Sequence, residues 1–399
     1  MGFHFTPNQE RVIQDAVNWY LHSPEQVFQI SGNPGTGKSV VLNEIIRRLQ
    51  LPLDKVAPMA YTGAASVVMR MKGLISARTI HSWLFQPVEV PVKDENGRVK
   101  IHPYYKTPII KIEFVPVDLS YIKLIVIDEA GSVPMNLKQH ILNTGAKVLV
   151  AGDLDQLPPV ADNPAFLYNG KVHWLTDIMR QAEGNPIIYL SQRAKNGLPI
   201  HLGNYGNVLV IAADDITDEM YMASPVILCG RNNTRNVLTN HIRHDLYHME
   251  GTLPNQYEKV ICRRNNWNIE ECGINLTNGL TGIVINQPSV RGFDGKDFIM
   301  DFKPEVDPTI TFSKLKCSYE YLIADRDQRN NIKKMPHVRS NLFEFGYALT
   351  VHLSQGSQWR GGMYYEEYMN PEINNKLNYT ALTRFSEMCI YVKPKRKYY

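Results

Sequence analysis

Short apolar runs, each followed by polar or glycine-rich sequence, recur through the first part of the chain. They occupy residues 27–30, 124–127 and 147–151. Runs of this length, bounded by turn residues, are typical of strands buried in a parallel sheet. After the first run, residues 40–49 carry apolar positions at the spacing of one helix face. We therefore expect an α/β fold in which strands and helices surround a parallel sheet.

Alternation of apolar and other residues marks the segment between residues 87 and 116. Valines alternate over residues 88–92, the turn sequence Asn96-Gly97 follows, and alternation resumes over residues 99–101. Asn-Gly between alternating runs is the strongest short-range signal for a β-hairpin. The segment therefore predicts a hairpin, which is either functional or a surface feature without a role.

The second half of the chain begins with a strand and a helix and then changes character. Residues 225–230 predict a strand, and residues 231–235 open a helix. Between residues 251 and 337 the runs are short and β-like, with turn residues such as Asn278-Gly279 between them. We expect a separate small β-structure in that range.

Composition and charge narrow the class of protein. The chain has 399 residues, 44% of them hydrophobic, which is enough for two or three domains with their own cores. A formal net charge of +4 is too small to indicate nucleic acid by itself. The five cysteines lack CxxC spacing, which disfavours zinc and disulfides and favours a reducing, cytoplasmic setting. No apolar run reaches membrane-spanning length, so we expect no membrane partner.

The glycine-rich sequence after the first apolar run supplies the first chemical signal. It has the P-loop spacing, in which backbone N–H groups and a helix N-terminus converge on an anion. Lys38 is expected to reach the β- and γ-phosphates, and the Ser39 hydroxyl to bind Mg²⁺. A chance glycine turn is the alternative. The predicted nucleotide-binding residues here are Gly32, Asn33, Pro34, Gly35, Thr36, Gly37, Lys38 and Ser39.

Two further strand ends carry polar residues suited to nucleotide hydrolysis. Asp128 and Glu129 follow the run 124–127, where Asp128 is expected to hold Mg²⁺ and Glu129 to polarise the attacking water. A solvated strand end is the alternative. After the run 147–151, Gln156 lies between acidic residues and a Pro-Pro turn, a position suited to sensing the γ-phosphate.

The sequences Asp128-Glu129-Ala130 and Gly152-Asp153-x-x-Gln156-Leu157-Pro158-Pro159 resemble the superfamily 1 helicases, within them the RecD-like branch that includes the phage Dda-like helicases. The resemblance implies two RecA-like P-loop domains with parallel sheets, a β-hairpin pin inserted in the first and a small β-barrel inserted in the second. The implied boundaries are 1–181 for the first domain with the pin at 86–116, 182–250 and 338–399 for the second domain, and 251–337 for the barrel.

The resemblance also extends the nucleotide site. Residues 174–181 resemble motif IV, whose arginine reaches across the cleft, which makes Arg180 a catalytic candidate with a surface salt bridge as the alternative. Residues 378–384 resemble motif VI and add Arg384, and residues 346–359 resemble motif V and add Gly356. Gln9 resembles the Q motif, and its amide matches adenine N6 and N7, although an exposed N-cap segment is the alternative. The catalytic candidates are then Lys38, Asp128, Glu129, Gln156, Arg180 and Arg384.

A third set of residues is implied to contact single-stranded nucleic acid. Residues 60–65 resemble motif Ia, although Ala64 stands where many relatives carry lysine. Ordinary core packing is the alternative for His81, and helix capping is the alternative for the polar start of the helix after residue 230. The candidates are Tyr61, Thr62, His81, Asn233, Thr234, His352, Ser354 and Gln355.

These implications converge on an ATP- and Mg²⁺-dependent DNA helicase that moves along single-stranded DNA, with 5′ to 3′ polarity taken from the resemblance alone. An ATP-gated single-stranded DNA-binding or remodelling protein that does not unwind stays open. The expected partners are single-stranded DNA and duplex junctions, with replication or recombination proteins as further candidates. A monomer in the cytoplasm of a bacterial or phage-infected cell is the expected setting.

Overall fold

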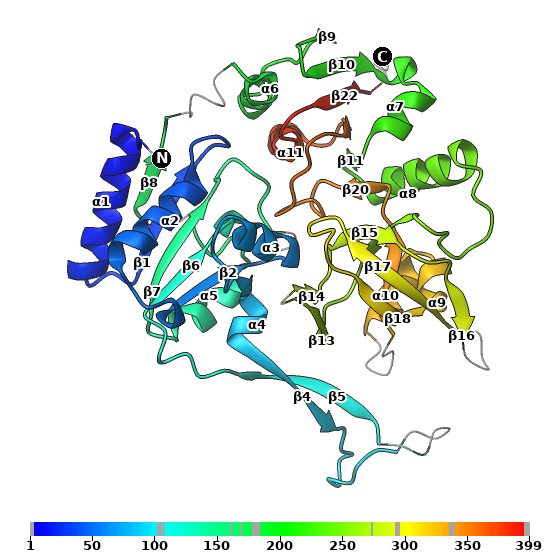
Figure 1. Ribbon diagram of the computed structural model, residues 1–399, viewed down its shortest axis with the longest axis horizontal. Helices are drawn as coiled ribbons and strands as arrows, with labels where there is room; N and C mark the ends of the chain where they lie inside the picture. Colours follow the sequence, from blue (N-terminus) through cyan, green and yellow to red (C-terminus); the bar gives the residue numbers. More distant parts are fainter. Residues whose placement is uncertain are drawn as a thin grey trace. The chain divides into compact units, whose positions relative to one another are not determined.

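A computed structural model of the chain describes residues 4–101, 106, 108–159, 162–167, 170–177, 184–272, 274–291, 296–334 and 340–394. The chain forms two compact units, whose elements are labelled in Figure 1. The first unit comprises Met1–Ile80, Leu119–His248 and Tyr347–Tyr399, and the second comprises His81–Asp118 and Met249–Gly346. No helix in the described ranges is long and apolar enough to cross a membrane.

The first sheet of the first unit has six strands in the order β3-β2-β6-β7-β1-β8, all joined by parallel pairings. The strands are Val27–Gly32 (β1), Val56–Ala60 (β2), Arg78–Thr79 (β3), Leu124–Ile127 (β6), Lys147–Gly152 (β7) and Val172–Leu175 (β8). The three predicted apolar runs form β1, β6 and β7, which lie next to one another and are almost wholly buried. The predicted α/β fold with a parallel sheet is confirmed.

Helices hold the carboxyl ends of these strands in place. The helices of this part are Pro7–His22 (α1), Lys38–Leu49 (α2), Gly63–Met71 (α3) and Met135–Leu142 (α5). In Figure 1, α1 and α2 (blue) lie beside β1. Their apolar faces, including Ile13 and Leu42, pack with Ile30 of β1 and Leu149 of β7 in one buried cluster. The loop between β1 and α2 is therefore anchored at both ends.

The second sheet of the first unit has the order β20-β11-β21-β22-β10-β9 and is parallel except at β9. Its strands are Gly203–Asn204 (β9), Val208–Ala212 (β10), Ile227–Cys229 (β11), Ala348–Thr350 (β20), Met363–Tyr365 (β21) and Cys389–Lys393 (β22). Figure 1 shows β10 (green) beside β22 (red), so the sheet joins segments far apart in the sequence. Its helices are Pro186–Lys195 (α6), Asp218–Ala223 (α7), Asn232–Asn240 (α8) with a π-helical turn at His241–Leu246, and Pro371–Leu382 (α11).

The second unit contains a long antiparallel ribbon. After the short helix Ile80–Leu84 (α4), strand Phe85–Pro91 (β4) pairs with Ile110–Pro116 (β5) from Phe85↔Pro116 to Pro91↔Ile110. The predicted pairing around Asn96-Gly97 is present at the tip, where Lys93 pairs with Val99 and the Lys100 N–H donates to the Val92 carbonyl oxygen at 2.8 Å, but most of the ribbon pairs β4 with the later strand β5. Asn96-Gly97 does lie in a tight turn, closed by Asp94 N–H to the Arg98 carbonyl at 2.8 Å, but it turns only the tip. The longer partner strand satisfies more backbone hydrogen bonds than the three-residue run, and the turn signal could not reveal it.

The strands in the remainder of the second unit pair antiparallel, and Cys317 and Asn341 form an isolated parallel bridge. Strands β16, β17, β15, β12 and β19 form one path, β18 also pairs with β17, and β13 pairs with β14. The elements are Lys259–Cys262 (β12), Asn266–Glu271 (β13), Ile274–Leu276 (β14), Thr281–Val284 (β15), Ser289–Arg291 (β16), Asp297–Pro304 (β17), Phe312–Ser318 (β18), Tyr319–Ile323 (α9), Arg326–Lys334 (α10) and Phe343–Phe345 (β19). Closure of these strands into a barrel stays a prediction.

The cysteines divide sharply by exposure. Four are buried and one is exposed. Burial raises the pKa of the Cys229 and Cys262 thiols to about 12 and raises those of Cys317 and Cys389 as well. The exposed cysteine is Cys272, directly after β13 in the second unit. The buried thiols are core side chains of low reactivity.

Candidate nucleotide-binding site

The loop between β1 and α2 folds around its own lysine. Lys38 Nζ donates to the carbonyl oxygens of Gly32 at 2.6 Å and Asn33 at 3.2 Å. Gly37, with φ of +82°, is the N-cap of α2, and no side chain in the described part of the chain caps it through a hydrogen bond. The first N–H groups of α2 therefore lack a side-chain acceptor, which is the arrangement that suits a phosphate.

The start of α1 is tied to this loop. Thr6 and Gln9 form a capping box, in which each side chain accepts from the other's backbone N–H. Gln9 is buried, and its Nε2 donates to the carbonyl oxygen of Thr36 at 2.9 Å. The alternative of an exposed segment is wrong for Gln9. Its amide supports the phosphate loop in this conformation, and its contact with adenine stays a prediction.

Ser39 and Asp128 bring two oxygen donors together beside the loop. Ser39 Oγ donates to Asp128 Oδ2 at 3.2 Å. Hydroxyl and carboxylate oxygens are ligands that Mg²⁺ prefers, so the pair fits the predicted metal position. Burial raises the pKa of Asp128 and Glu129 raises it further, whereas Lys72, the Glu129 N–H and Lys38 offset part of the shift. A cation bound at these oxygens would favour the charged carboxylate.

Glu129 has an unusual backbone conformation. Its φ of +53° and ψ of +39° lie in the left-handed region, which costs a residue with a side chain on the order of 1 kcal/mol or more. The Glu129 N–H donates to Asp128 Oδ1 at 2.9 Å, and the turn Ala130–Ser132 follows directly. Backbone strain of this kind is often held at functional sites. It aims Glu129 Oε1 towards Arg384 Nη1, 3.9 Å away.

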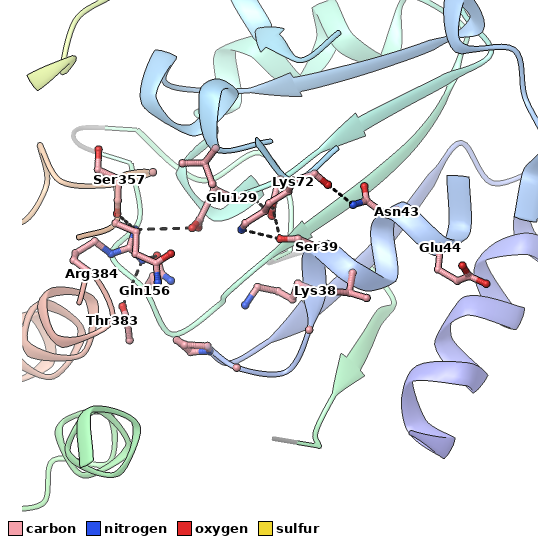
Figure 2. A pocket seen from close by; sticks show the side chains of 18 of the residues that line it. Lys38, Ser39, Asn43, Glu44, Lys72, Glu129, Gln156, Ser357, Thr383 and Arg384 are labelled. Carbon is pink, nitrogen blue, oxygen red and sulfur yellow. Dashed lines mark hydrogen bonds and ion pairs between the residues drawn. The ribbon is translucent and has the colours of Figure 1, made fainter. Parts of the chain in front are cut away.

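Arg384 follows α11 of the second sheet and reaches the residues of the first. Its side chain is buried, and Nη2 donates to Gln156 Oε1 at 3.0 Å. Nη1 donates to the carbonyl oxygen of Ser357 at 3.3 Å. Figure 2 shows Arg384, Gln156 and Ser357 facing Glu129 across the site. A fixed guanidinium near a carboxylate and a glutamine is suited to stabilising negative charge on a phosphoryl group.

These residues surround one cavity of about 980 Å³. A volume of this size accommodates a nucleotide. The predicted residues that line it are Pro34, Gly35, Gly37, Lys38, Ser39, Asp128, Glu129, Gln156, Gly356 and Arg384. The other predicted loop residues, Gly32, Asn33 and Thr36, support the loop by hydrogen bonds to Lys38 and to one another.

The segment after β7 is hydrogen-bonded to the second sheet's elements. Tyr379 OH donates to Asp153 Oδ2 at 2.5 Å, and the Leu157 N–H donates to Thr380 Oγ1 at 3.0 Å. Gln355 Nε2 donates to the Leu157 carbonyl oxygen at 2.8 Å. Burial raises the pKa of both Asp153 and Tyr379. Residues 153–157 therefore contact the nucleotide cavity on one side and α11 on the other.

Gly356 allows the second sheet's loop to approach α3 closely. A Cβ atom at Gly356 would lie 2.5 Å from Thr62 Oγ1 and 2.8 Å from the Ala65 Cβ atom, and its φ is +80°. Any other residue would clash and be strained there. The motif V candidate and the motif Ia candidate are thus neighbours, with Thr62 serving as the N-cap of α3.

The predicted strand-contacting residues differ in accessibility. Ser354 is fully buried, and its Oγ donates to the Val351 carbonyl oxygen at 2.7 Å, so it offers no hydroxyl to a strand in this conformation. Thr234 Oγ1 donates to Glu367 Oε1 at 2.5 Å. Glu367 Oε2 also accepts the N–H groups of Gly230 and Arg231, so a carboxylate lies directly before the start of α8. Thr234 is therefore held by Glu367 and does not cap α8, whose N-cap residue is Arg231.

The other strand candidates lie partly or fully at the surface. Tyr61, His81 and His352 are half-buried, and Asn233 is exposed. Burial lowers the pKa of both histidines, so each is neutral at neutral pH. Their contacts with a strand stay predictions. Arg180 lies outside the described residues.

Sequence reasoning missed several residues that line or support the cavity. Lys72 lines it and donates through Nζ to Ser39 Oγ at 3.1 Å. Phe5 and Arg48 also line it, and the Arg48 guanidinium lies 6.0 Å from the Phe5 ring centroid. Tyr379 was noted only as part of motif VI. The local sequence signal for Lys72 is the glycine directly after it, Gly73, because a glycine is typical of a helix end.

Comparison with known proteins agrees with this geometry. Residues 5–209 match the family described as AAA domain. The ATP-dependent RecD2 DNA helicase of Deinococcus radiodurans is 27% identical over 376 residues, covering 89% of this chain and 45% of the relative. The ATP-dependent DNA helicase Pif1 of a Psychrobacter species is 29% identical over 189 residues, covering 41% of this chain and 26% of that relative. The chain thus spans less than half the length of these relatives.

Solved structures share the fold across nearly the whole chain. A structure described as the basis for DNA unwinding at forked dsDNA by two coordinating Pif1 helicases has a TM-score of 0.57 at 16% identity, covering 98% of this chain and 92% of that one. The Bacteroides Pif1 helicase in complex with ADP-AlF3 and ssDNA has a TM-score of 0.54, with the same identity and coverage. At this identity the likeness shows the fold alone. Together with the sequence relatives, it confirms the resemblance to RecD-like and Pif1-like helicases.

Proposed function

Because the chain belongs to the AAA domain family, matched over residues 5–209, we propose that it is an ATP-dependent DNA helicase that moves along single-stranded DNA. One observation carries the proposal. The P-loop, the Asp128-Glu129 pair and Arg384 come from two parallel sheets and line the same cavity. The two sheets are assigned to two RecA-like domains, residues 1–181 for the first and 182–250 with 338–399 for the second. Nucleotide chemistry in a cavity with such a lining can change how the two sheets are held together.

The residues take distinct parts in ATP hydrolysis. Lys38 and the N–H groups of the loop bind the phosphates, and Ser39 and Asp128 hold Mg²⁺, which neutralises phosphate charge when bound. Glu129 orients the attacking water and accepts its proton. Arg384, with Gln156 beside it, stabilises charge on the transferred phosphoryl group. Arg180 is proposed as a second arginine at the same group.

Movement along a DNA strand follows if ATP hydrolysis changes the contacts between the elements of the two sheets. The bonds of Asp153 to Tyr379 and of Leu157 to Thr380 join the γ-phosphate side of the cavity to α11. Gln156 lies between them in sequence and contacts Arg384. A phosphate that withdraws Arg384 from Gln156 would therefore loosen or shift this contact, and the strand-contacting residues of the two sheets would move relative to each other.

Strand separation is assigned to the β4–β5 ribbon as a pin, and residues 251–337 to a small β-barrel insertion. The relatives are named DNA helicases, and one structural neighbour is described with forked DNA. We propose that this chain likewise takes single-stranded DNA and duplex junctions, with 5′ to 3′ movement. The pin needs to do little work, because opening one stacked base-pair step costs roughly 1.4 kcal/mol.

The test measures ATP hydrolysis with and without single-stranded DNA, and unwinding of duplexes with a 5′ or a 3′ overhang. Stimulation by DNA and unwinding from the 5′ overhang are expected, and Lys38→Ala should abolish both. If oligonucleotides leave hydrolysis unchanged, the motor assignment fails.

A ribbon variant separates the pin from the motor. Replacing residues 92–109 by Asn-Gly joins β4 to β5 through a two-residue turn and keeps the pair Pro91↔Ile110. This variant should retain DNA-stimulated hydrolysis and lose unwinding. Undiminished unwinding would show that the ribbon is not the pin, and would leave the motor assignment intact.

A further inference from the structure

The backbone of Lys72 is held firmly at the end of α3. The Leu74 N–H donates to the Met69 carbonyl oxygen at 3.0 Å, and the Gly73 N–H donates to that of Arg70 at 2.9 Å. These two bonds and the φ of +104° at Gly73 form a Schellman motif. Asn43 of α2 adds a bond from Nδ2 to the Lys72 carbonyl oxygen at 2.6 Å. The anchoring of Lys72 is thus shared by α3 and the helix that follows the P-loop.

The side chain of Lys72 points to the predicted metal position. Its Nζ donates to Ser39 Oγ at 3.1 Å, and Ser39 Oγ donates to Asp128 Oδ2 at 3.2 Å, as Figure 2 shows for the lysine and the serine. Lys38 makes its bonds to loop carbonyl oxygens instead. Both lysines act electrostatically on Asp128, and of the two it is Lys72 that is hydrogen-bonded to the Ser39 oxygen. Lys72 is exposed, so its long side chain can leave without unpacking the core.

We propose that Lys72 is a tethered monovalent cation that takes the place of magnesium at Ser39 and Asp128 and is displaced when a magnesium nucleotide binds. The inference rests on the proposed nucleotide binding at this cavity. A serine oxygen has one donor hydrogen and two lone pairs, so its bond from Lys72 uses an acceptor position that a metal ligand needs. Mg²⁺ also demands near-octahedral oxygen ligands at about 2.0–2.1 Å, which an ammonium in the same space prevents.

Two effects of opposite sign follow. With magnesium present, the lysine competes with the metal and weakens binding of the magnesium nucleotide. With magnesium absent, the ammonium supplies positive charge next to the phosphates and strengthens binding of the bare nucleotide. The ratio of the two dissociation constants therefore measures the role of Lys72 directly. A residue that only supports the fold would change both constants in the same direction.

The experiment measures binding of a fluorescent ADP analogue to the full chain, in excess EDTA and across a magnesium titration. For Lys72→Met, the dissociation constant in EDTA should rise about tenfold, the loss expected for one charge-assisted hydrogen bond. In saturating magnesium it should fall by about twofold to threefold, because an exposed charged group contributes little. The magnesium concentration at half-maximal binding should fall with it.

Two further variants control the measurement. Lys72→Arg keeps the charge on the same anchored residue and should keep a ratio close to that of the wild type. Lys123→Met removes an exposed lysine that is not among the residues lining the cavity, and should leave both constants unchanged. An unchanged ratio in Lys72→Met, or weaker binding in both conditions, would overturn the inference. A wild-type chain that binds no nucleotide in either condition would overturn the proposed function instead.

Discussion

Two strand-to-helix junctions in the first unit have the same local order and opposite electrostatic states. At the first, β1 leads through Gly37 into α2, whose N-terminus has no side-chain cap among the described residues and faces the cavity. At the second, β11 leads into α8, and the buried Glu367 carboxylate accepts the N–H groups of Gly230 and Arg231, the two residues directly before the first helical residue Asn232. Both helix ends attract an anion. In the first the anion would come from a ligand, and in the second the chain provides it.

The difference teaches that a polar sequence at a helix start does not by itself mark a phosphate site. The first turn of α8 was predicted to hold strand-binding residues, including Thr234, yet the Thr234 hydroxyl is bonded to Glu367. Glu367 lies 133 residues further along the chain, so no local pattern could reveal the pairing. The P-loop needs no distant residue to make its donors converge, which is why its pattern is informative.

The largest expected effect is that of Arg384, which follows α11 of the second sheet and lines the cavity at the start of α2. Arg384→Ala should lower the rate of ATP hydrolysis by roughly 10³-fold or more, because a guanidinium at the transferred phosphoryl group contributes on this scale. Binding of a fluorescent nucleotide, measured in parallel, should change little and so report that the cavity is intact. A rate within about threefold of the wild type would mean that Arg384 is structural.

A smaller effect, on stability, is expected at the junction between β11 and α8. Glu367→Ala leaves the N–H groups of Gly230 and Arg231 and the Thr234 hydroxyl without their acceptor, and should lower the free energy of unfolding by about 2 kcal/mol. Urea denaturation measures this loss. Glu372→Ala, an exposed residue in the first turn of α11, is the control and should change stability by about 0.5 kcal/mol or less.

Glu367→Ala also tests whether the starts of α2 and α8 bind anions in the same way. Without its carboxylate, the start of α8 resembles the start of α2, so added sulfate should stabilise Glu367→Ala more than it stabilises the wild type or Glu372→Ala. Equal stabilisation of all three proteins by sulfate would show that the two helix ends are not equivalent.

The smallest effect concerns Asp153, a second buried carboxylate, which accepts hydrogen bonds from the Asp155 N–H, Gln156 and Tyr379. Burial raises the pKa of Asp153 above its ordinary value of 3.8, so the folded chain keeps this proton to a higher pH than the unfolded chain. Stability from Asp153 is therefore present at low pH and is lost as the pH rises through the folded pKa. Asp153→Asn keeps an oxygen that can accept from Tyr379 and gives up the second acceptor, so its stability relative to the wild type should be higher at neutral to alkaline pH than near pH 4. The gain is read from urea denaturation across pH.

The exposed Asp54→Asn is the control for this pH dependence and should show none. A gain of equal size at every pH would assign the effect of Asp153→Asn to packing rather than to ionisation.

Much of the fold and of the cavity could be predicted because the signals are local. The apolar runs gave β1, β6 and β7, and the loop spacing and the carboxylates after β6 gave the residues around Ser39 and Asp128. Features that depend on distant pairing could not be found this way. The partner of β4 lies beyond the predicted turn, and the Lys72–Ser39 bond joins two helices 33 residues apart. Arg180 remains a prediction.

The distribution of cysteines makes the second unit accessible to observation in solution. Four thiols are buried with raised pKa values, so a maleimide dye at neutral pH should react with Cys272 alone. A single fluorophore then marks the antiparallel unit of the natural chain without any mutation. The fluorescence polarisation of this dye, followed while nucleotide and DNA are added, would report whether the second unit moves together with the first unit or independently of it.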